Sequence, residues 1–143
     1  MMLDLATALS IADGTLQQGR DRDAAPLAVA VLDVGGHVKV VLREDGAAYL
    51  RVEIAIAKAW GALGMGQSSR HLANRAQQGQ PEFFMSLVAV GRGRVALSAG
   101  GVLCTDRDGE VIGAVGVSGD DVSDVDEACA AAAIEACGYR TIR

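Results

Sequence analysis

The chain has 143 residues, of which 50% are hydrophobic and 22% are charged, and its formal net charge is −5. This composition excludes an intrinsically disordered chain, because hydrophobic burial can offset the entropy lost on folding. The length predicts a single domain over residues 1–143. The apolar runs are too short for a transmembrane helix, so a membrane partner is not expected. The negative charge argues against a nucleic-acid partner, because such binding depends on neutralising phosphates.

Apolar periodicity and turn residues predict the elements of the first half of the chain. Leucines and alanines at helical spacing predict a first helix over residues 3–18. Two β-branched runs separated by two glycines predict a hairpin, with strands over residues 27–34 and 37–44. A second helix is predicted over residues 50–65. Its apolar residues lie nearly all round, so we expect it to be buried on both sides.

The second half of the chain predicts short polar helices followed by three more strands. Residues 68–78 indicate a short helix or loop capped by one of its first serines, and residues 81–85 indicate a short turn after a proline. The further strands are predicted at residues 94–98, 102–106 and 111–118. A last helix is expected to begin with Ser123 as its N-cap and to end before Gly138.

This order of elements predicts an α+β fold with an antiparallel sheet, because the strands occur as hairpins. We expect five strands, with helices covering at least one face. The chain contains 18 glycines and only 3% aromatic residues. Small residues favour close contacts between elements, either within one subunit or between subunits.

The three cysteines point to a reducing compartment, and we expect a cytoplasmic protein. Cys129 and Cys137 are predicted to lie about 12 Å apart along one helix, too far for a disulfide. No CxxC or HxxxH spacing occurs, so no metal site is expected. The acids near the start of the last helix are explained by capping and by the helix dipole.

Four segments follow a recognisable pattern. They are Leu27–His37 (LAVAVLDVGGH), Ile54–Ala59 (IAIAKA), Ser98–Val102 (SAGGV) and Val111–Gly119 (VIGAVGVSG), the last followed by Asp126-Glu127. In this order, they resemble the hairpin, helix, glycine-rich and closing motifs of the GlcG/HbpS-type proteins. The resemblance spans residues 3–137. It also extends to the C-terminal domain of PduO-type adenosyltransferases.

The resemblance implies a profilin-like or PAS-like fold with a five-stranded antiparallel sheet, and even-numbered homo-oligomers. Proteins of this type include a haem-binding component of a redox sensor, and the family is often described as haem-binding or haem-degrading. Haem is therefore the cofactor that the resemblance implies. The PduO-type domain takes an axial histidine from its early helix. Residues 3–18 of this chain contain no His, Met, Cys or Tyr, so the cofactor stays open.

Lys58 is the first candidate site residue. It lies on the predicted apolar helix, and no acid stands three or four residues away. A partly buried lysine needs a partner or loses its proton, so Lys58 is a candidate for binding a carboxylate or for acid–base chemistry. Alternatively, its stem packs while the ammonium reaches water, or it pairs with an acid from another element such as Asp33.

The predicted hairpin tip and the segment after the second helix hold the other titratable candidates. Asp33 and His37 flank the two glycines, where the acid is expected to stabilise the turn or to assist the imidazole as a base. His71 neighbours Arg70 and suits contact with an anion. Alternatively, His37 and His71 are simply exposed.

The stretch from Gly91 to Gly101 is rich in glycine and basic. Arg92 and Arg94, with Gly100 and Gly101, favour an anionic ligand, because glycines allow close approach of backbone N–H groups. The alternative is turn geometry and close packing. Neither a Walker loop nor a Rossmann fingerprint is present.

Two functions remain open at this point. The first is a binding module for a small anionic organic ligand, with haem as one candidate, held between the sheet and residues 50–79. The second is a cofactor-independent isomerase, hydratase or lyase acting on a small carbonyl or carboxylate compound, with Lys58 or His37 as the acid–base group and Arg92 or Arg94 holding the carboxylate. A purely structural oligomerisation protein is a third possibility.

Overall fold

The structure, a computed structural model, describes residues 2–143. Its helices are α1 (Leu5–Asp21), α2 (Leu50–Met65), α3 (Ser69–Gln77), α4 (Pro81–Val90) and α5 (Ser123–Ala136). Its strands are β1 (Ala28–Asp33), β2 (Val38–Arg43), β3 (Gly101–Thr105), β4 (Val111–Ser118) and β5 (Arg140–Ile142). The strands form one antiparallel sheet in the order β2-β1-β4-β3-β5. The expected α+β class is therefore confirmed.

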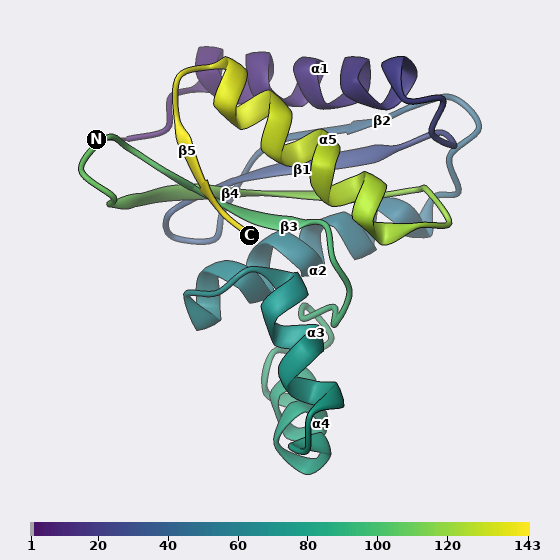
Figure 1. Ribbon diagram of the computed structural model, residues 1–143, viewed down its shortest axis with the longest axis vertical. Coiled ribbons are helices and arrows are strands. Elements are labelled where there is room, and N and C mark those ends of the chain that lie inside the picture. Colours follow the sequence, from purple (N-terminus) through teal and green to yellow (C-terminus); the bar gives the residue numbers. More distant parts are fainter. Residues whose placement is uncertain (1) are drawn as a thin grey trace.

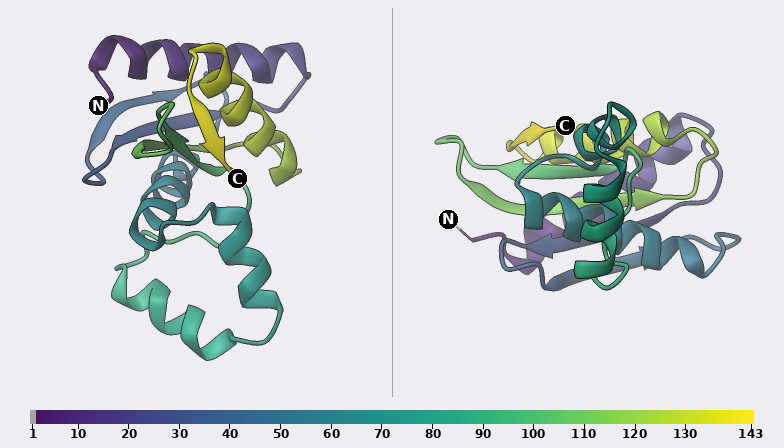
Figure 2. Two further views of the ribbon diagram at one scale, coloured as in Figure 1. Left: turned by 60° about the vertical axis from the view of Figure 1, so that its left-hand side comes forward. Right: turned by 90° about the horizontal axis from the view of Figure 1, so that it is seen from below.

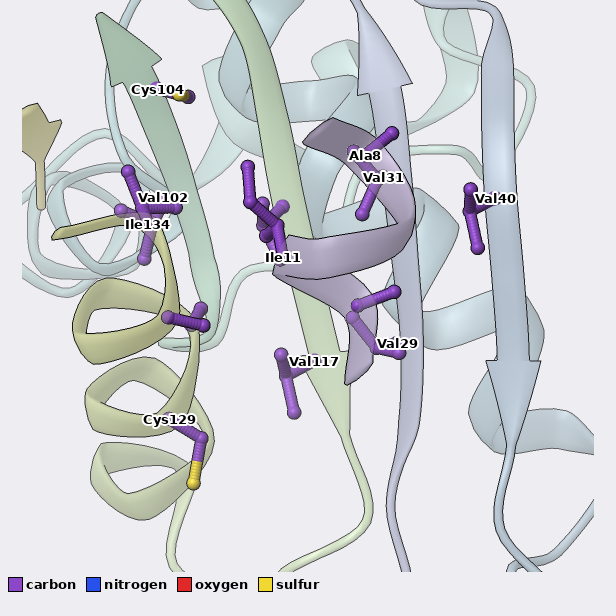
Figure 3. Packing of buried hydrophobic residues seen from close by; sticks show 14 of the residues in the cluster. Ala8, Ile11, Val29, Val31, Val40, Val102, Cys104, Val117, Cys129 and Ile134 are labelled. Atoms are coloured by element: carbon purple, nitrogen blue, oxygen red, sulfur yellow. The ribbon is translucent and has the colours of Figure 1, made fainter. Parts of the chain in front are cut away.

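The sheet separates two unequal layers (Figure 1). α1 and α5 lie together over one face, and α2 packs against the other. The main hydrophobic core fills the space between the sheet and the first layer, where side chains such as Ile11, Val117 and Ile134 meet (Figure 3). α3 and α4 form an arm that projects away from the sheet beyond α2, as the left view in Figure 2 also shows.

α2 lies unusually close to the sheet because glycines face it. A Cβ on Gly116 of β4 would overlap the Ala55 carbonyl oxygen of α2, and one on Gly101 of β3 would overlap the Lys58 carbonyl. These glycines therefore allow direct contact between the helix backbone and the strands. The expectation that α2 is buried on both sides holds for its central turns, where the buried residues are Ala55, Ala57, Lys58, Ala59, Gly61 and Ala62.

One predicted strand is wrong. Residues 94–98 form no strand, and the fifth strand is the C-terminal β5, which pairs with β3 through Leu103 and Ile142. Val95, whose apolar character favoured a strand, packs instead against Gly61 of α2. Val95 therefore packs against α2 instead of pairing at the edge of the sheet.

Several boundaries also differ from those predicted, and α1, for example, ends at Asp21 rather than at residue 18. The N-cap position of α5 is Val122 rather than Ser123, and no side chain caps it. The segment expected as a short turn at residues 81–85 is the start of the ten-residue helix α4. Gly138 does follow the end of α5 with a positive φ of 88°, as the sequence predicts. None of the helices in residues 2–143 is long and apolar enough to cross a bilayer.

Candidate functional site

Lys58 is buried on α2, and its ammonium makes two polar contacts. Nζ donates a hydrogen bond to the Val117 carbonyl oxygen at 2.8 Å and lies 3.3 Å from Asp126 Oδ2. Burial lowers the pKa of Lys58 and raises the pKa of Asp126, while the attraction between their charges opposes both shifts. Lys58 is 2% exposed and lines none of the hollows described below, so the amine is not open to a substrate.

The partner of Lys58 comes from a distant element, as one of the sequence interpretations allowed. That interpretation named Asp33, but the partner is Asp126 at the start of α5. Asp33 instead accepts hydrogen bonds within its own hairpin turn. Within residues 2–143, the structure therefore does not place Lys58 beside His37 or Asp33 as an acid–base site.

Arg70 at the start of α3 is neutralised by acids from α5. Its Nε donates to Glu127 Oε2 at 2.8 Å, and its Nη2 contacts Asp124 Oδ1. A polar groove of about 300 Å³ runs beside this cluster, between α3 and the residues before β3. Because two carboxylates already hold the guanidinium, the groove offers little attraction for an anion.

The other candidates from the middle of the chain are dispersed. The side chain of His71 is exposed on α3, and its backbone N–H donates to the Ser68 hydroxyl at 3.2 Å. Arg92 is exposed in a left-handed conformation after α4. Gly100 and Gly101 are buried against Lys58, so their lack of a side chain serves close packing. The ligand was expected between the sheet and residues 50–79, and this packing fills the part of that space next to α2.

The tip of the β1–β2 hairpin does bring several candidates together. Asp33 Oδ1 accepts the backbone N–H groups of Gly35 at 2.9 Å and of His37 at 3.0 Å. These bonds lower the pKa of Asp33. His37 Nδ1 lies 3.4 Å from the same oxygen, and its side chain is 82% exposed. The carboxylate therefore both closes the turn and orients the imidazole.

Trp60 of α2 forms the wall behind this tip. A Cβ on Gly36, which has a positive φ of 83°, would lie 3.1 Å from the indole ring, so a glycine is needed there. The guanidinium of Arg94 lies over the same indole ring, 4.0 Å from its centroid. A cation over an indole face is a favourable electrostatic contact and stays available to an anion at its edge.

Two hollows flank the hairpin tip. One, of about 190 Å³, has a largely apolar wall that includes Leu3 and Ile112, with His37 and Lys39 at its rim. The other, of about 140 Å³, lies between Trp60 and the turn. We call these two hollows together the hairpin-tip site. Its lining residues are Met2, Leu3, Asp33, Val34, Gly35, Gly36, His37, Lys39, Trp60, Leu63, Gly64 and Ile112, and Arg94 is added through its stack on Trp60.

The donor set of the hairpin-tip site suits an organic anion with an apolar body. Its imidazole is a possible axial ligand for haem iron, and its ammonium and guanidinium are possible partners for carboxylates. α1 contains no His, Met, Cys or Tyr and therefore offers no side chain of these types as an iron ligand. His37, in contrast, lines the largely apolar hollow. Within residues 2–143, no group of three or more His, Cys, Asp or Glu side chains is placed to hold a metal ion.

Residues 3–135 match the family model of the haem-degrading proteins described as HbpS-like. The chain belongs to the HbpS-like family. A protein of Citrobacter freundii, described as an uncharacterized 15.0 kDa protein in the dhaT-dhaS intergenic region, is 32% identical over 94 residues. That match covers 66% of this chain and 64% of the Citrobacter protein. The resemblance inferred from the four motifs is thus confirmed.

Solved structures agree with membership of the HbpS-like family. A complex of PduOC with haem has a TM-score of 0.87 and 26% identity, covering 100% of both chains. The ORFY protein of Klebsiella pneumoniae has a TM-score of 0.83 and 27% identity, covering 94% of this chain and 90% of its own. A double mutant of HbpS from Streptomyces reticuli has a TM-score of 0.80 and 26% identity, with 95% and 87% covered.

Sequence reasoning did not assign a binding role to Trp60 or Lys39. Trp60 belongs to the predicted helix over residues 50–65. Trp60 lies ten residues after the start of α2, the helix that follows the hairpin in the chain, and this position carries no local signal of contact with Gly36. Lys39 belongs to the predicted strand over residues 37–44. The placement of Trp60 and Lys39 at the hairpin-tip site depends on how this member of the HbpS-like family packs its hairpin against α2.

Proposed function

We propose that the chain is a small-molecule binding domain that takes an anionic organic ligand at the hairpin-tip site, with haem as the first candidate. The main support for this proposal is that the His37 imidazole, the Lys39 ammonium and the Trp60–Arg94 stack lie around the two hollows. The haem complex of PduOC, with a TM-score of 0.87, supports the choice of haem. In this assignment His37 would coordinate the haem iron, and Lys39 and Arg94 would pair with the haem carboxylates.

The size of the hollows defines how the ligand sits. Ligand sites that enclose a drug-sized molecule usually have volumes of roughly 300–1,000 Å³. The hollows of about 190 and 140 Å³ therefore hold one edge of a porphyrin and leave the remainder outside. Binding to one chain is then weaker than binding in a closed pocket. The free cysteines support a reducing compartment such as the cytoplasm as the place where this binding occurs.

Titration with haemin tests the proposal by two signals. Coordination by His37 shifts the Soret band of haemin, and haem beside the chain's only tryptophan quenches its fluorescence. We expect both signals to saturate at micromolar haemin with the same midpoint. Protoporphyrin without iron should quench Trp60 but should not respond to loss of the imidazole, which separates coordination from anion binding.

The two histidines provide matched variants. His37→Ala should abolish the Soret shift while leaving part of the quenching, and Arg94→Ala should weaken the quenching by both porphyrins. His71→Ala, which changes the exposed histidine of α3, should leave both signals unchanged. Absence of saturable binding in the wild-type protein removes haem as the ligand. Loss of the Soret shift in His71→Ala with retention in His37→Ala rejects the hairpin-tip site.

A further inference from the structure

Two of the three cysteines come together where the end of α5 passes over β3. In Figure 3, Ile134 of α5 lies against Val102 of β3, and Cys104 follows farther along the strand. α5, from Cys129 to Ile134, runs in the same direction as β3 in this view. Cys137, three residues after Ile134, is therefore carried towards the part of β3 that holds Cys104. Cys137 also packs against the hydrophobic core to which Cys104 belongs.

The electrostatics of the thiols agree with this placement. Burial raises the pKa of Cys104 to about 12, and the negative charge of a Cys137 thiolate adds to the shift. Charges influence one another in this way only when they lie near each other, because the interaction falls with distance. Cys129 lies about two turns before Cys137 on α5. Its pKa responds instead to burial and to charges such as those of Arg22 and Asp126.

A hollow of about 440 Å³ opens between the β3–β4 turn and the end of α5. Its lining residues are Asp106, Arg107, Asp108, Cys137, Gly138 and Tyr139. Cys137 is half-buried in its wall, whereas Cys104 is inaccessible to solvent. A small reagent can therefore reach the Cys137 sulfur through the hollow, while the Cys104 sulfur is shielded. Access thus makes the two thiols unequal partners.

We propose that Cys137 and Cys104 are an oxidation site at which a small hydroperoxide converts the two thiols into a reversible disulfide. The Cys137 thiolate attacks one peroxide oxygen, the O–O bond breaks, and the other oxygen takes up the proton that the thiol lost. The Cys104 thiol then attacks the sulfur of the Cys137 sulfenic acid. The S–O bond breaks as the S–S bond forms, and the hydroxyl leaves as water with the proton of Cys104. Two thiols are oxidised, and one hydrogen peroxide is reduced to two waters.

The end of α5 can adjust to form this bond. A disulfide requires its two Cα atoms to come within about 7 Å. Cys137 is the C-cap and lies after the last helical residue, Ala136. A Cβ placed on the following Gly138 would meet no atom within 4 Å, so the chain has open space there. In a reducing compartment such a bond is transient, as is usual for disulfides that respond to oxidants.

Peptide mapping after peroxide treatment tests the pairing. The native protein is treated with hydrogen peroxide, unfolded and then alkylated, so that every remaining thiol is labelled. We expect a cross-linked peptide that joins Cys104 to Cys137 and separates on reduction with dithiothreitol, while Cys129 is labelled. A non-reducing denaturing gel should show the mass of one chain. A disulfide that includes Cys129, a Cys137–Cys137 bond between two chains, or complete labelling of all three thiols overturns the proposal.

Single variants separate the roles of the two sulfurs. In Cys137→Ser, Cys104 should stay reduced because burial shields it from peroxide. In Cys104→Ala, the sulfenic acid of Cys137 has no second thiol to meet and should proceed to sulfinic acid, which dithiothreitol does not reverse. Cys129→Ala also removes a buried thiol, and it should form the disulfide as the wild type does.

The amount of sulfinic acid at Cys137 decides whether Cys104 takes part. We expect several times more of it in Cys104→Ala than in the wild type after the same treatment, because the disulfide protects Cys137. Circular dichroism checks that each variant is folded, and the exposed position of Cys137→Ser keeps one variant informative if Cys104→Ala is unstable. Equal amounts of sulfinic acid, or oxidation of Cys104 in Cys137→Ser as fast as in the wild type, overturn the proposal.

Discussion

Lys58 of α2 and Asp126 of α5 form a buried ion pair that joins helices on opposite faces of the sheet. Their side chains are 3% and 1% exposed, and Nζ lies 3.3 Å from Oδ2. Asp126 Oδ1 also accepts the backbone N–H of Asp120 at 3.2 Å, and Lys58 also donates to the Val117 carbonyl. The pair therefore fixes the turn between β4 and α5 as well as the position of α2.

Breaking this pair from one side should be costly. In Lys58→Met a carboxylate is left without its cation, and in Asp126→Asn an ammonium is left without its anion. We expect each change to lower the free energy of unfolding by about 3–5 kcal/mol, as is usual for one half of a buried pair. Urea unfolding followed by circular dichroism measures this loss.

Removing both charges should cost less than the sum of the two single changes. Lys58→Met/Asp126→Leu replaces two charges by apolar side chains, and such replacements are often close to neutral. Arg143→Ala, which removes a solvent-exposed ion pair with Glu135, serves as the control and should change stability little. Additive losses in the double variant would show that the two residues act independently.

The close packing of α2 on the sheet predicts opposite effects at two glycines. Gly116→Ala places a methyl group on the Ala55 carbonyl and should lower the unfolding free energy by about 3 kcal/mol, the upper part of the range for overpacking. Gly64→Ala, within α2 and with no atom within 4 Å of the new methyl, should raise it by roughly 0.5–1 kcal/mol. Thermal and urea unfolding of both variants test the pair. Equal effects would contradict the packing.

Acid unfolding should depend on two carboxylates, those of Asp33 at the end of β1 and Asp120 between β4 and α5. Backbone N–H groups of His37 and Gly35 lower the pKa of Asp33, and those of Ala25 and Val122 lower the pKa of Asp120. A carboxyl group with a lowered pKa in the folded state contributes stability above its ordinary value of 3.8, and this contribution is lost as the pH falls through the folded pKa. We therefore expect the wild type to lose stability steeply below that pH.

The corresponding amides provide the check. The amide side chains of Asp33→Asn and Asp120→Asn do not titrate, so each variant lacks the stability that the carboxylate contributes at neutral pH. Each variant should therefore be less stable than the wild type at neutral pH and should lose less stability on acidification. Unfolding by urea at a series of pH values measures the slope. A slope in Asp120→Asn as steep as that of the wild type would assign the acid sensitivity to other groups.

The cysteines should differ in reactivity. Burial raises the pKa of Cys104 to about 12, and it also raises the pKa values of Cys129 and Cys137. The thiolate is the reactive form, so all three should react slowly near neutral pH. Cys137 is the only one of the three that is partly exposed and should be alkylated first. Mass spectrometry of the native protein treated with iodoacetamide gives the order, and early labelling of Cys104 would contradict it.

Local signals explain which parts of the fold the sequence predicts well. The helix over residues 50–65 and the strand over residues 111–118 have the predicted bounds, because periodicity and turn residues act on near neighbours. Residues 94–98 have a strand-like composition but form no strand, and Val95 packs against α2. The edge of the sheet is instead formed by the C-terminal strand β5, whose sequence has no strong strand signal. Edge pairing depends on which segment reaches β3, and composition does not encode that.

The amino-acid sequence by itself determined the family, the α+β class, and the hairpin that carries Asp33 and His37, since each depends on residues close together in the chain. Only the tertiary structure decided that Lys58 pairs with Asp126, 68 residues away, and that Trp60 and Arg94 stand beside the hairpin tip. The physical reason is that burial and charge pairing depend on contacts between distant segments. A lysine on an apolar helix has the same local pattern whether it faces a ligand or a carboxylate of its own chain.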